Sequence, residues 1–115
     1  MESKGRIINI IEETIKEFVE RMRPPENLRN QVDIHYTFEN NELVLFEVRP
    51  LLNKSKKIIS SPFARTKYIT SSETWKLYWM RASGEWDIYE PQPTINDIRE
   101  FFQIVQQDKH YCFFG

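Results

Sequence analysis

The stretch WKLYWMRASGEWDIYE, residues 75–90, decides the fold because it holds all three tryptophans of the chain. Before the Ser83-Gly84 pair, tryptophan and leucine occupy every second position. This period of two is typical of a β-strand, in which successive side chains point to opposite faces. The pattern therefore predicts a β-hairpin that turns at Ser83-Gly84 and ends before Pro91.

The position of that turn sets which residues lie opposite each other on the two strands. In the predicted hairpin, Trp79 pairs with Ile88 and Tyr78 pairs with Tyr89. Both faces then stay consistent across the strands, with the three tryptophans on one face and the two tyrosines on the other. Large rings that share a face usually build a core, so we expect the tryptophan face to be buried.

The flanking segments carry their own periodic signals. Residues 6–23 repeat apolar side chains at helical spacing before Pro24-Pro25, which predicts an amphipathic helix. Residues 32–50 alternate on both sides of Asn40-Asn41, which predicts a second hairpin because asparagine tolerates positive φ angles. For the other segments we expect a connector over 51–64, a strand over 65–70, a helix capped by Thr94 and a docked apolar tail over 111–115.

This order of elements predicts the fold class. Runs of antiparallel strand flanked by helices are typical of α+β proteins. We expect one domain, residues 1–115, with an antiparallel sheet of about five strands made of two hairpins and a connecting strand. An N-terminal and a C-terminal helix flank that sheet, and the sequence leaves open which face they cover.

Composition restricts the class of protein and its compartment. Hydrophobic residues make up 40% of the chain, which suits a globular protein. Cys112 is the single cysteine, so no internal disulfide forms and we expect a cytoplasmic location. The N-terminal apolar segment is broken by Asn9, Glu12 and Glu13, so we expect neither a signal peptide nor a membrane span.

Charge is unevenly distributed along a chain whose net charge is only −1. Residues 51–72 hold five cations and no acid, whereas the segments on either side are acidic overall. The predicted Tyr78/Tyr89 face adds aromatic rings and Lys76, an arrangement that sheets use to bind single-stranded nucleic acid. A basic loop is also often merely solvated. The candidate binding residues are Lys54, Lys56, Lys57, Arg65, Lys67, Lys76, Tyr78 and Tyr89.

Catalytic and metal-binding patterns are weak by comparison. No nucleophile elbow, phosphate-binding loop or dinucleotide fingerprint occurs, and only three glycines exist to build one. Cys112 follows His110 closely, but its aromatic neighbours favour an inert buried thiol. Asp108, His110 and Cys112 alternate and would form a zinc site with His35, although the spacing matches no known closed site. We therefore assign no catalytic, metal or cofactor-binding residue and expect no cofactor.

A distinctive set of motifs also connects the chain to one family. These motifs are Ala64-Arg65, WKLYWMR (75–81), Gly84-x-Trp86, Tyr89-x-Pro91 and the ending DKHYCFFG (108–115). Over roughly residues 30–115 the chain resembles a family of small bacterial proteins known as domain of unknown function 3024. Ser83 and Phe114 depart mildly from its pattern, which has an acidic turn residue and a tryptophan there. The resemblance implies a bacterial, cytoplasmic protein and brings no activity and no catalytic residues.

Three functions remain open from the sequence. The first is a non-enzymatic binding or regulatory module whose partner is a macromolecule or a second copy of the chain. The second is a nucleic-acid-binding protein that uses the basic stretch 54–67 and the aromatic face. The third is an enzyme of an unfamiliar type.

Overall fold

The computed structural model describes residues 2–50 and 57–114, with side chains from residue 10 onward. Within these residues the fold is α+β, as the sequence predicts: an antiparallel sheet with an N-terminal and a C-terminal helix. The elements are α1 (Glu2–Met22), the 3-10 helix η1 (Glu26–Leu28), β1 (Asp33–Glu39), β2 (Glu42–Pro50), β3 (Ile58–Ile69), β4 (Thr74–Met80), β5 (Trp86–Ile88), β6 (Thr94–Ile95) and α2 (Ile98–Gln107). Strand order is β1-β2-β3-β4-β5, and β6 pairs with β4 beyond the end of β5.

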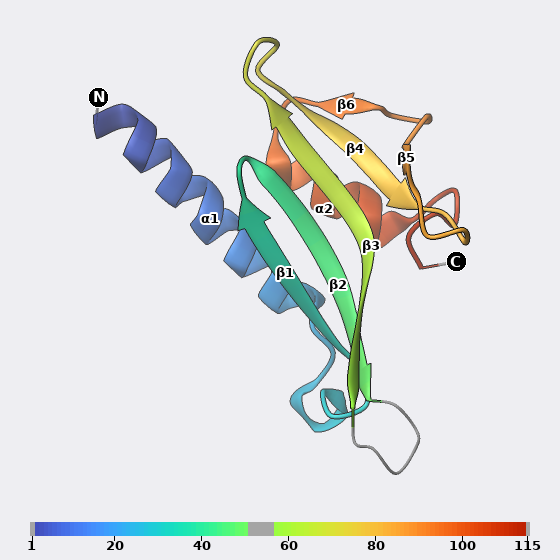
Figure 1. Cartoon of the computed structure of the whole chain (residues 1–115). Helices are drawn as coiled ribbons and strands as arrows, with labels where there is room; N and C mark the ends of the chain where they lie inside the picture. The colour runs from blue at the N-terminus through green and yellow to red at the C-terminus, as the bar shows by residue number, and fades with distance from the viewer. Residues whose placement is uncertain (1, 51–56, 115) are drawn as a thin grey trace.

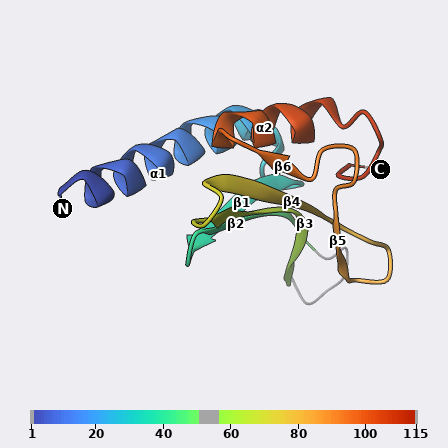
Figure 2. The same ribbon diagram turned by 90° about the horizontal axis from the view of Figure 1, so that it is seen from above.

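Both α-helices lie on the same side of the sheet (Figure 1, Figure 2). The two helices contact each other through Phe18 and Phe102, whose rings stack with centroids 5.0 Å apart. Beneath them the core takes alternate residues of the central strands, among them Leu43, Leu45 and Leu77, which are fully buried. The described part of the chain places no helix over the opposite side of the sheet, and this answers the question that the sequence left open.

The first hairpin forms as its sequence predicts. Asn40 and Asn41 both have positive φ angles, 52° and 61°, which is the geometry of the two-residue turn that joins twisted strands most readily. Helix α1 begins four residues earlier than predicted and ends at Met22, just before Pro24-Pro25. Proline lacks the amide hydrogen that a helix interior requires, so the helix stops there.

The predicted connector over 51–64 is wrong for its second half. Strand β3 already begins at Ile58 and pairs with β2 from there to Lys67. Ile58 and Ile59 are exposed, so no buried face produces the alternation that would reveal this strand. The first residues of β3 are held instead by backbone hydrogen bonds to the long strand β2. Such pairing does not depend on a local sequence pattern. The first half of the connector, 51–56, lies outside the described residues.

The tryptophan hairpin forms with a register that differs from the prediction by one residue. The Arg81 amide donates to the Glu85 carbonyl, which closes a three-residue loop in which Gly84 has a φ angle of 87°. Tyr78 therefore lies opposite Ile88, and Trp86 lies opposite Met80. Because side chains alternate, this shift moves Trp86 away from the core face and moves Tyr89 onto it.

The second helix also begins later than predicted. Thr94 is not its cap but lies in β6, opposite Lys76 of β4. The N-cap is Asp97, whose side chain accepts the Arg99 amide, while Glu100 reaches back to the Asp97 amide. This reciprocal pair is a capping box. Thr94 is drawn into the sheet because β5 is short and leaves part of the β4 edge to be paired.

The C-terminal tail folds back onto the body of the protein. Asp108 ends α2 in the left-handed conformation, and its carboxylate accepts the amides of Phe113 and Phe114 at 3.0 and 2.8 Å. These bonds direct Phe113 into the core, where its ring packs on Tyr89 with centroids 5.2 Å apart. The prediction of a docked tail is confirmed for Phe113, whereas half of Phe114 stays exposed.

Candidate binding face of the sheet

The side of the sheet that the helices leave uncovered carries a continuous group of half-buried side chains. On β4, Lys76, Tyr78 and Met80 alternate with the buried residues Trp75 and Leu77, and the neighbouring strands follow the same parity. We call this surface the open face. Its members on β2 to β5 are Glu42, Val44, Phe46, Arg65, Lys67, Lys76, Tyr78, Met80, Trp86 and Ile88.

Arg65 of β3 lies within the open face and contacts residues of β2, β4 and β5. It stands opposite Tyr78 in the β3–β4 ladder, and its guanidinium carbon lies 4.5 Å from the Tyr78 ring centroid and 5.8 Å from that of Trp86. Both distances are within the range of a cation–π interaction. Glu42 on β2 forms an ion pair with Arg65, at 2.5 Å from Oε1 to Nε. The arginine is thus held in place as part of an aromatic and basic cluster.

Two lysines lie beside this cluster with their backbones directly opposite each other. Lys67 of β3 pairs with Lys76 of β4, and the Lys76 ammonium lies 5.8 Å from the Tyr78 ring centroid. Lys67 also lies opposite Glu42 of β2, whose carboxylate pairs with Arg65, and among the described side chains neither lysine forms an ion pair. Like charges at directly opposed positions destabilise a sheet. The open face therefore carries a net positive charge, because Glu42 offsets only one of the three cations Arg65, Lys67 and Lys76.

The structure brings together four of the eight residues that the sequence proposes for binding: Arg65, Lys67, Lys76 and Tyr78. Lys57 is exposed just before β3, and Lys54 and Lys56 lie outside the described residues. Tyr89 is wrongly placed by the prediction, because it is buried beside Phe113 on the helix-covered side.

Trp86 is the member of the open face that the sequence interpretation missed. The prediction placed it in the core, together with Trp75 and Trp79 on one face. Its position follows from the three-residue loop that ends the hairpin, and the signal for that loop is Gly84. A glycine in the left-handed position after a type I turn closes three-residue hairpins, whereas Ser83-Gly84 suggested a two-residue turn.

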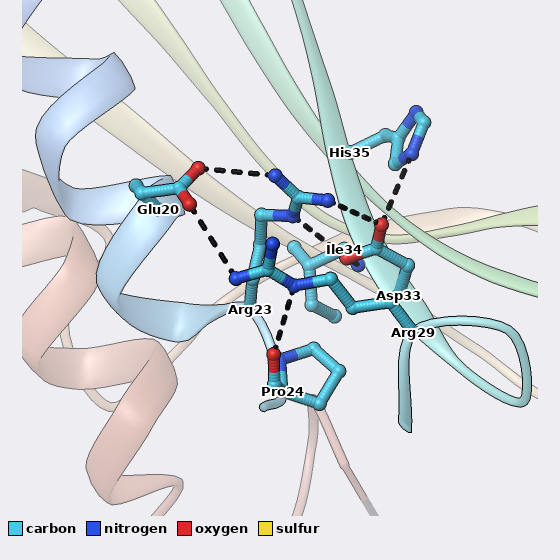
Figure 3. A network of polar contacts seen from close by, with 7 residues as sticks. All are labelled: Glu20, Arg23, Pro24, Arg29, Asp33, Ile34 and His35. Carbon is cyan, nitrogen blue, oxygen red and sulfur yellow. Dashed lines mark hydrogen bonds and ion pairs between the residues drawn. The ribbon is translucent and has the colours of Figure 1, made fainter. Parts of the chain in front are cut away.

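A second polar cluster joins α1 to the edge strand β1 (Figure 3). Arg23 follows α1 and donates two hydrogen bonds of 2.9 Å to the buried carboxylate of Asp33. Asp33 in turn accepts the Ile34 amide at 2.8 Å. At the opposite edge of the sheet, Asp87 accepts the Ile88 amide in the same manner at 2.9 Å. An edge amide that is already bonded is not free to pair with another strand, so these aspartates have a structural role.

A groove of about 480 Å³ lies next to the Asp33 cluster, between α1 and β1. The residues that line it are Lys16, Val19, Glu20, Arg23, Ile34, His35 and Tyr36. Its charged groups are largely engaged with one another, since Arg23 binds both Asp33 and Glu20. These ion pairs hold the end of α1 against the sheet, and this structural role explains why the charged residues lie here.

The Arg23–Asp33 pair makes the free energy of unfolding depend on pH in the acidic range. Hydrogen bonds from Arg23 lower the pKa of Asp33 from 3.8 to about 2. Above pH 4 the pair is intact, and as the pH falls from 4 to 2 the unfolded chain gains a proton before the folded chain does. The parent should therefore lose about 2 kcal/mol of stability over this interval through Asp33. Urea unfolding at several pH values measures this loss, and Asp33→Asn should show a smaller one. Equal pH dependence in both proteins would contradict the assignment.

The residues weighed for zinc or for nucleophilic chemistry serve other purposes. Both carboxylate oxygens of Asp108 are occupied by tail amides, and the Cys112 thiol lies 3.6 Å from the His110 carbonyl oxygen. Burial raises the pKa of Cys112, which favours the thiol over the nucleophilic thiolate. Among the described residues, no three histidine, cysteine, aspartate or glutamate side chains come together in a way that would hold a metal ion.

The fold and the face define an α+β protein in which helices cover one side of an antiparallel sheet and a basic, aromatic face remains on the other. The chain belongs to the family described as Domain of unknown function (DUF3024), whose profile matches residues 4–115. The resemblance noted over the later part of the sequence thus extends through α1. No curated protein and no solved structure matches the chain. None of the helices described here has the length and apolar character needed to cross a membrane.

Proposed function

We propose that this chain is a non-enzymatic binding module of one domain that presents its open face to a polyanionic macromolecule in the cytoplasm. The observation that carries the proposal is the opposed pair Lys67 and Lys76 beside the Arg65–Tyr78–Trp86 cluster. A bound anion would offset the positive charge of the two lysines, of which only Lys67 has an acidic residue, Glu42, opposite it in the sheet.

The charge of the open face also distinguishes between possible partners. Arginine, tyrosine, tryptophan and methionine are enriched in protein interfaces, so the face could in principle pair with a second copy. A symmetric pairing of two open faces whose two-fold axis passes near the lysines would, however, bring Lys67 and Lys76 of one copy close to those of the other. Like charges brought together at an interface are costly, and this favours a partner of opposite charge.

Retention on a heparin column at low salt tests the proposal, because heparin is a general polyanion. The parent should be retained, and the double variant Lys67→Glu/Lys76→Glu should elute at much lower salt. The matched control is Lys16→Glu/Lys109→Glu, which changes the net charge equally at exposed lysines away from the open face. An unretained parent, or equal weakening by both double variants, would overturn the proposal. Light scattering on the same samples reports whether any copy pairs with another.

A stability measurement probes the lysine pair without any partner. Replacing Lys76 by glutamate puts an opposite charge across from Lys67, so the free energy of unfolding should rise by about 0.5 kcal/mol. Residues kept for binding often cost stability in this way. Urea unfolding of the parent, Lys76→Glu and Lys76→Gln separates the removal of repulsion from the new attraction. A loss of stability in Lys76→Glu would show that the fold itself requires the lysine.

A further inference from the structure

We infer that the polyanion is a single-stranded nucleic acid, whose bases stack on Tyr78 and Trp86 while its phosphates contact Lys67 and Lys76. This inference rests on the proposed function and adds the chemical class of the partner. It follows from the order of side chains along β4 and its neighbours, from the partial exposure of Tyr78 and Trp86, and from the Arg65 guanidinium near both rings.

The open face offers cations at one end and aromatic rings further along, the two kinds of group that a nucleic acid strand can engage. Lys76 comes two residues before Tyr78 on β4, and the residue two positions after Tyr78, Met80, lies opposite Trp86. A chain that runs along β4 therefore meets the lysine pair first, then the Tyr78 ring, and then the Trp86 ring. Cations, rings and an interposed guanidinium are the groups by which open sheets hold unpaired strands.

The two rings favour a single strand over a duplex. Bases in a single strand expose their faces and can stack on aromatic side chains or on a guanidinium plane. In a duplex the same faces are already stacked inside the helix, and only the phosphates remain for the lysines. An acidic protein would also use the lysines, but it offers no planar bases to the rings. Loss of a ring therefore distinguishes these partners, whereas loss of a lysine does not.

Fluorescence anisotropy with labelled oligonucleotides tests the inference. The probes are oligothymidylate and oligouridylate of about 12 nucleotides, within the usual site size, and a DNA duplex of equal length. The parent should bind at least one single strand more tightly than the duplex, and the two single-stranded probes separate DNA from RNA. Tyr78→Leu and Trp86→Leu, which remove a ring but stay apolar, should each weaken single-strand binding on the order of tenfold.

The salt dependence gives an independent measure of the phosphate contacts. Each contact to a single strand contributes a slope of about −0.7 in a plot of log affinity against log salt concentration. Lys67→Ala/Lys76→Ala should therefore make the slope shallower by about 1.4, while Tyr78→Leu should lower affinity and leave the slope unchanged. Circular dichroism and thermal melting confirm that each variant is folded.

The outcomes separate this inference from the proposed function. If the parent binds heparin through Lys67 and Lys76 but binds duplex as tightly as single strands, or if both ring variants bind like the parent, the single-strand assignment is overturned. The polyanion-binding function would then stand, with an acidic protein or a duplex as the partner. If the parent binds neither heparin nor any oligonucleotide at low salt, both are overturned.

Discussion

Replacing Trp75 by alanine should lower the free energy of unfolding by about 3–5 kcal/mol, the range for large aromatic residues removed from a core. Only 3% of Trp75 is exposed. Its ring packs against Tyr68 and Phe38, with centroids 5.1 and 6.4 Å away. Urea unfolding monitored by circular dichroism measures the loss, since the tryptophan fluorescence itself changes in the variant.

Trp86→Ala is the matched control for this substitution, because it removes the same side chain from the other side of the sheet. Trp86 is half-buried on the open face, where its ring lies within cation–π distance of the Arg65 guanidinium. The loss should be smaller, about 1–2 kcal/mol, from a partly exposed cation–π interaction and the partial burial of the ring. Equal losses for Trp75→Ala and Trp86→Ala would contradict the observed register and would place Trp86 in the core, as the sequence pattern had predicted.

Removing the Phe113 ring should also lower the stability strongly. Phe113 is 6% exposed and packs on Tyr89, so Phe113→Ala should cost about 3 kcal/mol. For a chain of this length, such a loss lowers the melting temperature by about 10 °C or more. The structural reason is that the tail closes one end of the core rather than extending into solvent.

Phe114→Ala serves as the control, because the neighbouring ring is half exposed and packs on Phe63 with centroids 5.1 Å apart. Its cost should be about 1 kcal/mol, since roughly half of the ring area is already in water. Thermal melting of the two variants beside the parent distinguishes the roles. A melting temperature for Phe113→Ala that equals the parent value would show that the tail is not part of the core.

The elements that could be predicted from the sequence are those with a strong local signal. Residues 6–22 form a helix because a stripe of apolar side chains recurs at helical spacing, and Pro24-Pro25 stops it. The first hairpin is correct because Asn40 and Asn41 adopt the positive φ angles that its turn demands. Together with the alternation in β4, these signals were sufficient for the α+β class.

The errors occurred where a distant segment determines the structure. Thr94 looks like a helix cap, yet it pairs with Lys76 because β5 leaves that part of the β4 edge open. The beginning of β3 has exposed apolar residues and no alternation, but β2 extends far enough to pair with it. In both cases hydrogen bonds to a neighbouring strand outweigh a weak local preference.

The candidate site shows the same division. The sequence by itself determined that Lys76 and Tyr78 share one face of a strand, since alternation alone places them there. Only the tertiary structure decided that both helices cover the opposite side, that Trp86 joins this face and that Tyr89 leaves it. The physical reason is that side-chain parity within a strand is a local property. The relative position of strands depends on loop closure, and the choice of the buried face depends on packing between segments distant in the chain.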